Sequence, residues 1–77
     1  MLFIMNLRFT NHATYRIFYE RNISADKIKM TIAKPDSSEK LQNNLIKSKK
    51  VLDKKRLVVV YSRNKRGEYV IITAYFQ

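Results

Sequence analysis

Two β-branched runs constrain the fold of this chain more than any other feature. They are RLVVVYS, residues 56–62, and EYVIITAYF, residues 68–76. Val, Ile, Thr and aromatic residues favour β-strands. The intervening RNKRG contains the only glycine of the chain, Gly67, which suits a tight turn. The sequence therefore predicts an antiparallel hairpin, and the remaining elements must pack on it.

The two faces of this hairpin differ in kind. Both runs are continuously apolar, so both faces are expected to be at least partly covered. Alternate residues of a strand share one face, and we call each such set a parity. One parity is purely aliphatic and aromatic, and we expect the helices to pack on it. It comprises Val58, Val60, Val70, Ile72, Ala74 and Phe76. The other parity bears hydroxyl groups and is expected to lie on the open side; it comprises Leu57, Val59, Tyr61, Tyr69, Ile71, Thr73 and Tyr75.

Two short helices are predicted before the hairpin. After an extended segment at residues 7–9, Thr10 or Asn11 can cap a helix over about residues 12–21. Ser24 can cap a second helix that ends before Pro35. The expected buried positions are Ala13 and Ile17 in the first helix and Ala25, Ile28 and Ile32 in the second.

The order of elements indicates the fold class. We predict one α+β domain over residues 1–77, with two N-terminal helices on one face of an antiparallel sheet of three to four strands. One strand is expected within residues 41–52, and residues 36–38 are expected to form a turn. The opening MLFIMNLRF is too short for a membrane span and lacks a cleavage site, so we expect no membrane association and a cytoplasmic location.

Positive charge is the strongest indication of function. The chain has 77 residues, of which 16 are Lys or Arg and 6 are Asp or Glu, a net charge of +10. Between Lys40 and Arg66 ten basic residues accompany a single acid, Asp53. Such a field attracts polyanions, of which nucleic acid is the commonest. A solvated basic surface and an acidic protein partner are the alternatives.

The composition excludes several kinds of catalytic site. One histidine and no cysteine cannot form an ordinary zinc site, and one glycine cannot form a phosphate-binding loop. We therefore expect no metal and no cofactor. Cleavage of RNA by its own 2′-hydroxyl remains, because it needs only a proton acceptor, cations and a proton donor.

His12 and Arg16 lie four residues apart and share one side of the first predicted helix. Together they could address one phosphate, and histidine is suited to proton transfer near neutral pH. Alternatively, His12 orients the first turn and Arg16 pairs with Glu20. Tyr61, Thr73 and Tyr75 could stack bases and contact phosphate, or could belong to the sheet core. Basic residues at the hairpin tip could bind phosphate or only confer solubility: Arg63, Lys65 and Arg66.

A family resemblance supports the ribonuclease hypothesis. FTNHATYRIFYERNIS, residues 9–24, resembles the opening of small prokaryotic domains of unknown function with a His-Ala-x-x-Arg helix followed by Arg-x-Ile-Ser. RLVVVYSRNKRGEYVIITAY, residues 56–75, resembles their closing hairpin. These domains are similar in layout to BrnT-type toxins and more remotely to the RelE/ParE-like toxin superfamily, which cleave RNA with basic and aromatic residues.

The resemblance implies roles for particular residues. It points to His12, Arg16 and Arg21 in the helical motif, and to Tyr61, Thr73 and Tyr75 in the strands. BrnT-type chains commonly carry arginine where this chain has Tyr75, so Arg16 or Arg63 is expected to supply that cation.

Three functional hypotheses follow from these patterns. The first is a metal-independent ribonuclease of the toxin–antitoxin type, in which His12, Arg16 and Tyr75 are catalytic and an acidic antitoxin covers the basic face. In this hypothesis RNA is bound by Arg21, Tyr61, Arg63, Lys65, Arg66 and Thr73. The second is a basic module that binds nucleic acid without catalysis. The third is an interaction protein that binds an acidic partner.

Overall fold

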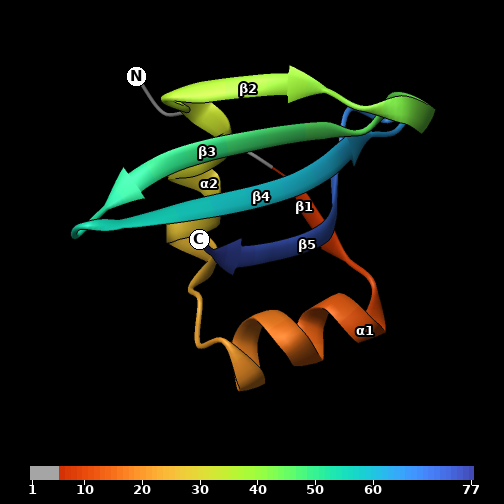
Figure 1. Cartoon of the computed structure of the whole chain (residues 1–77). Helices are drawn as coiled ribbons and strands as arrows, with labels where there is room; N and C mark the ends of the chain where they lie inside the picture. The colour runs from red at the N-terminus through yellow and green to blue at the C-terminus, as the bar shows by residue number, and fades with distance from the viewer. Residues whose placement is uncertain (1–5) are drawn as a thin grey trace.

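The sheet has five strands, and one of them precedes the helices (Figure 1). The structure is a computed structural model that describes residues 6–77. The strands are β1 (Leu7–Phe9), β2 (Ser37–Lys40), β3 (Ile46–Leu52), β4 (Lys55–Arg63) and β5 (Tyr69–Phe76). The helical elements are α1 (Asn11–Thr14), η1 (Tyr15–Glu20), α2 (Ala25–Ala33) and a short 3₁₀ turn η2 (Gln42–Asn44).

The predicted sheet was wrong in strand number and direction. The strand order is β1-β5-β4-β3-β2, and β1 runs parallel to β5 while all other pairs are antiparallel. The sheet is therefore mixed, and the helices are not the first elements of the chain. β1 has three residues, too few for a periodicity to indicate its partner. β2 is polar and fully exposed, so no apolar pattern marks it in the expected turn region.

The local helix signals were confirmed. The Thr10 hydroxyl accepts a hydrogen bond from the Ala13 amide at 3.0 Å, and the Ser24 hydroxyl accepts one from the Lys27 amide at 3.3 Å. The second helix spans Ala25–Ala33 as expected. The first does not continue as an α-helix, because η1 is a π-helix. None of the sequence patterns described above predicts this change from an α-helix to a π-helix.

A bulge in β5 overturns the predicted assignment of the faces. Tyr61 pairs with Ile71 and Val60 pairs with Thr73, so Ile72 is an extra residue that shifts the register. Strict alternation therefore fails along β5, and the parity on β4 is the reverse of our prediction. The face that packs on the helices carries Leu57, Val59, Tyr61, Tyr69, Ile71, Ala74 and Phe76.

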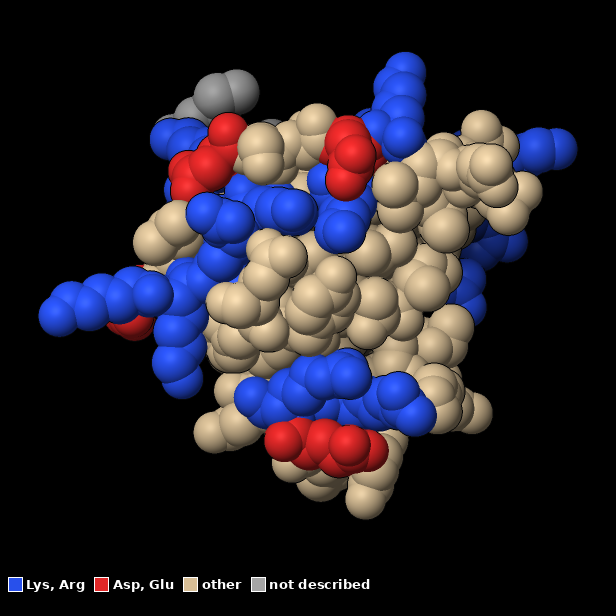
Figure 2. Space-filling view, in the orientation of Figure 1, with Lys and Arg blue, Asp and Glu red and all other residues tan. Residues whose placement is uncertain are grey.

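The second face of the sheet carries the residues between these. Val58 and Val60 lie on it, with Thr73 and Tyr75 opposite them on β5. Helix α2 passes behind β3 and β4 in Figure 1, so Figures 1 and 2 view the sheet from this second face. Thr73 and Tyr75 thus lie on the side away from the helices, as predicted, whereas Tyr61 does not.

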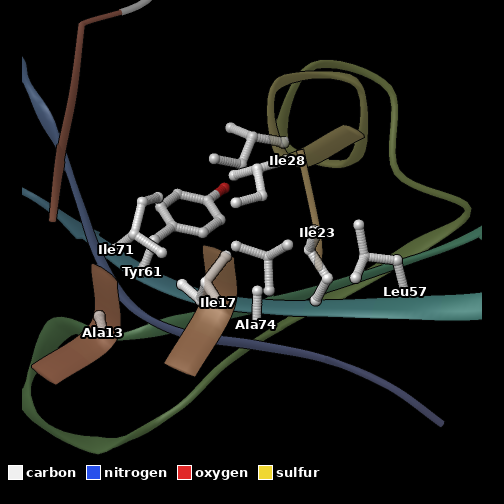
Figure 3. Packing of buried hydrophobic residues seen from close by; sticks show 10 residues of the cluster. Ala13, Ile17, Ile23, Ile28, Leu57, Tyr61, Ile71 and Ala74 are labelled. Atoms are coloured by element: carbon white, nitrogen blue, oxygen red, sulfur yellow. The ribbon is translucent and has the colours of Figure 1, made fainter. Parts of the chain in front are cut away.

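One apolar cluster joins the helices to the first face (Figure 3). Ile17 from η1 and Ile23 from the following loop lie against Ala74, and Ile28 from α2 lies near Tyr61. Ile17, Ile23, Ile28 and Ile71 are fully buried. Burial of each such side chain contributes on the order of 1.5–3 kcal/mol. The core therefore fixes η1 beside β5, which positions the residues considered next.

No helix in the described part of the chain, residues 6–77, is long and apolar enough to cross a membrane.

Candidate nucleic-acid interface

The second face of the sheet forms a surface that we call the basic face. Its defining residues are Lys47, Lys49, Arg56, Val58, Val60, Thr73 and Tyr75. In Figure 2 an uncharged centre is bordered by Lys and Arg side chains on several sides. A surface with cations around an apolar and hydroxyl-bearing centre suits a polyanion whose bases contact the centre.

The pairing of the strands sets this arrangement. Tyr75 lies opposite Val58, and Val58 lies opposite Lys49. In the adjacent row, Val60 lies between Thr73 and Lys47. Val58 is fully buried and Val60 is 9% exposed, although neither belongs to the core cluster. Each row therefore runs from a hydroxyl group on β5, across a buried valine, to a lysine on β3.

The element next to the free edge of β5 changes at the bulge. β1 pairs with β5 only from Tyr69 to Ile71, so the rest of that edge lies next to the helical segment instead of a strand. Arg21 reaches this edge, and its Nη1 donates to the carbonyl oxygen of Ala74 at 3.5 Å. Because Thr73 and Tyr75 flank Ala74 in the chain, the Arg21 guanidinium lies beside the β5 end of the basic face.

The π-helical turn changes which residues of this segment share a side. The amide of Arg21 donates to the carbonyl oxygen of Arg16 at 2.9 Å, the i→i−5 bond of a π-helix. In an α-helix, residues five apart point about 140° away from each other. The wider π turn reduces this angle, so the two positions lie nearer to one side of the segment. In Figure 2, Lys and Arg side chains with acidic side chains beside them lie below the uncharged centre of the sheet.

His12 lies one turn before Arg16 on α1 and is exposed. Ala13 and Ile17 hold the opposite side of this segment in the core. None of the side-chain hydrogen bonds found within residues 6–77 involves His12, so its imidazole is not used for capping there. We use the name edge cluster for the candidate site residues of the helical segment and of the second half of β5: His12, Arg16, Arg21, Thr73 and Tyr75. Of these helical residues, Arg21 contacts β5 through the Ala74 carbonyl.

Four of the predicted site residues lie outside the edge cluster, and two of them, Tyr61 and Arg63, contact other residues of the β4–β5 hairpin. Tyr61 is 7% exposed in the core cluster, where its ring meets that of Tyr69 at 5.6 Å between centroids. Our prediction that Tyr61 lies on an open platform was wrong, because the reversed parity of β4 turns it to the helices. Arg63 lies over the Tyr69 ring at 4.6 Å and donates to the Gly67 carbonyl at 3.2 Å. It is therefore engaged within its own hairpin.

Lys65 and Arg66 are exposed at the tip of the β4–β5 hairpin, away from the edge cluster. The tip is organised by Asn64, whose side-chain oxygen accepts from the amides of Arg66 and Glu68. The Asn64 amide also donates to Glu68, and this hydrogen bond is the main reason that the pKa of Glu68 lies below its ordinary value. Arg8, at 3.5 Å from Glu68, lowers that pKa further.

The sequence reasoning missed the three basic-face cations. Lys47, Lys49 and Arg56 were counted in the charge excess but not assigned to a site. The alternating lysines of IKSKKVL, residues 46–52, are the signal that could have found them, because alternation predicts one shared strand face. A shallow hollow beside them is lined by Ser37, Ser38, Glu39, Lys47 and Lys49.

Within residues 6–77, no group of three or more His, Cys, Asp or Glu side chains is arranged to hold a metal ion.

The comparisons with known proteins identify a family. Residues 9–76 match the model of DUF4258, a domain of unknown function. No curated protein and no solved structure gives a significant match. The match runs from Phe9, the last residue of β1, to Phe76, the last residue of β5, and the chain therefore belongs to the DUF4258 family.

Proposed function

We propose that this protein binds RNA on the basic face and cleaves it at the edge cluster without a metal ion. The observation that carries the proposal is the contact of Arg21 with the carbonyl of Ala74, which lies between Thr73 and Tyr75 on β5. His12 and Arg16 are exposed on the preceding turns of the same helical segment. This is the kind of activity that the resemblance to BrnT-type and RelE/ParE-like toxins implies.

RNA binding is supported by the charge of the basic face and by the fact that this face is not covered by a described helix. Lys47, Lys49 and Arg56 lie on one face, and no described helix packs over them. Lys and Arg contacts with phosphates release counterions, which supplies most sequence-independent affinity for nucleic acid. Tyr75 adds an aromatic ring on which a base can stack.

Cleavage is supported by the chemistry of the edge cluster. His12 would take the proton of the 2′-hydroxyl as its oxygen forms a bond to phosphorus. Arg16 and Arg21 would neutralise the charge that develops on the phosphoryl oxygens. Tyr75 would give a proton to the 5′-oxygen as the P–O5′ bond breaks. The products would be a 2′,3′-cyclic phosphate and a 5′-hydroxyl end.

The test is an RNA cleavage assay in EDTA with analysis of the product ends. We expect cyclic phosphate ends from RNA and no cleavage of DNA of the same sequence, which lacks the 2′-hydroxyl. His12→Ala should lower the rate by about 10²- to 10⁴-fold. Lys29→Gln, at an exposed position on α2, is the matched control and should cleave normally. RNA that is bound but left intact in EDTA would contradict the cleavage proposal.

A second candidate is RNA binding without catalysis. One observation favours it: His12 has no hydrogen-bond partner among residues 6–77 that would orient its ring, and general bases are usually oriented in this way. Under this candidate, salt-sensitive RNA binding would be retained in His12→Ala. An acidic protein that competes with RNA for Lys47, Lys49 and Arg56 is compatible with either candidate.

A further inference from the structure

Two tyrosines on η1 are exposed and stacked on each other. Tyr15 is 59% exposed and Tyr19 is 77% exposed. Their ring centroids are 5.8 Å apart and their planes are inclined by 29°. They are the two most exposed large hydrophobic side chains within the described residues, and the core does not contain them. Their exposure thus calls for an explanation other than folding.

The position of the pair follows from the helix. Ile17, midway between the two tyrosines in the chain, is fully buried against the sheet. Residues two positions away on either side of it therefore point to solvent. Arg16 lies between the buried side and the tyrosine side. The segment therefore presents Arg21 at the β5 edge, beside Ala74, and Tyr15 and Tyr19 on its solvent side.

This arrangement combines groups that match the two chemistries that a nucleic-acid strand presents. Arginines match phosphates, and aromatic rings match the faces of unpaired bases. A duplex keeps its bases stacked inside and cannot offer them to an exposed ring. An acidic protein would match the arginines, but the stacked ring pair adds an aromatic surface that suits a base better than an acidic side chain.

We propose that Tyr15 and Tyr19 bind an unpaired base of a single-stranded RNA whose backbone continues over Arg16 and Arg21 to the basic face. This inference rests on the proposed RNA binding and adds that the ligand is single-stranded at η1. It does not require that the protein cleaves RNA.

The test compares single-stranded and double-stranded ligands. The probe is a 2′-O-methyl RNA oligonucleotide, which cannot be cleaved through its 2′-oxygen, used alone or annealed to its complement. We expect Tyr15→Leu combined with Tyr19→Leu to weaken binding of the single strand by about 5- to 100-fold, the range for loss of base stacking. Binding of the duplex should be unchanged.

Two controls separate stacking from other effects. Tyr15→Phe combined with Tyr19→Phe retains the rings and should retain the affinity of the wild type. The Leu variant removes no charge, so the dependence of affinity on salt should keep the wild-type slope. Thermal unfolding of both variants should match the wild type, because both positions are exposed and leucine favours helices.

The outcomes distinguish this inference from the proposed function. If the wild-type protein binds neither probe at moderate salt, the proposed function itself fails. If the wild type binds the single strand and the Leu variant binds it equally well, only the role of the tyrosines is overturned. Equal weakening toward single strand and duplex would also overturn it. A wild-type dimer that the Leu variant abolishes would assign the pair to a second copy of the chain instead.

Discussion

The two halves of β5 are built from similar residues but have different surroundings. From Tyr69 to Ile71 the strand is paired on both sides, with β1 and β4. From Thr73 onward it is paired with β4, and its other edge faces Arg21. The single residue Ile72 separates the halves. An arginine accompanies each half: Arg63 covers the Tyr69 ring, and Arg21 reaches the Ala74 carbonyl.

The different surroundings of the two halves of β5 indicate which basic residues are free to bind a ligand. Arg63 and Arg8 are occupied by Gly67, Tyr69 and Glu68 within the hairpin region. Arg21 makes one long hydrogen bond at a strand edge that has no strand partner there. Bulges are common next to active sites, where they redirect side chains. The first half of β5 thus stabilises the sheet, and the second half presents the candidate site.

The largest expected effect tests the bulge itself. Ile71→Ala should destabilise the protein by about 2–5 kcal/mol, because Ile71 is fully buried and its loss leaves a cavity. Ile72→Ala, one residue further, should change stability by less than about 0.5 kcal/mol, because Ile72 is 41% exposed. Chemical denaturation of the two variants measures both values. A larger destabilisation by Ile72→Ala than by Ile71→Ala would contradict the bulge, because regular alternation from Ala74 would place Ile72 on the buried face.

An intermediate effect tests the two arginines against each other. Arg21→Gln should weaken binding of single-stranded RNA by about tenfold, as expected for loss of a hydrogen bond to a charged group. It should also lower the slope of log affinity against log salt by about 0.7. Arg63→Gln removes the same charge and should change the slope little, because Arg63 is engaged with Tyr69 and Gly67. Equal losses in both variants would show that RNA contacts both ends of β5.

The smallest effect concerns pH and the first half of β5. The hydrogen bond from Asn64, helped by Arg8, holds the pKa of Glu68 below its ordinary value. A lowered pKa in the folded state means that this contribution is present above the unfolded-state pKa. It is lost as the pH falls through the lower, folded-state pKa. Denaturation curves from about pH 6 to about pH 3 should therefore show a slightly flatter acid limb for Glu68→Gln than for the wild type. An unchanged acid limb would contradict this role of Glu68.

The parts of the fold that depend on local signals were predictable. Thr10, Ser24 and Pro35 act within a few residues, so the helix starts and the end of α2 follow from the sequence. The partner of β1 did not follow, because a three-residue strand carries too little pattern to choose a neighbour. The bulge at Ile72 was also hidden, since every residue from Tyr69 to Ile72 is apolar or aromatic and no polar residue marks the shift.

The candidate site was predictable in part. His12 and Arg16 share one helical side, and Thr73 and Tyr75 lie away from the helices. Arg21 was proposed only from the resemblance, because on an α-helix it would not lie beside Arg16. Our prediction placed Tyr61 on the wrong face of the sheet, because the two faces of β4 are the reverse of those predicted. What the sequence could not show is therefore a pair of backbone irregularities, the π turn of η1 and the bulge of β5, which lie next to the contact between Arg21 and Ala74.

The pairing of β1 with β5 has a consequence for the order of folding. β2, β3 and β4 pair with their neighbours in sequence, whereas Leu7 must meet Tyr69 from the other end of the described chain. Contacts between residues so distant in sequence form late, because closing the long loop is costly in entropy. Ala74, which accepts from Arg21 and belongs to the core, lies on β5, which already pairs with its neighbour β4. The late contacts are therefore those of the N-terminal segment that carries β1, Ile17 and Arg21. A chain in which this segment has not yet docked has neither a finished core nor a site, so binding competence and the folded state appear together.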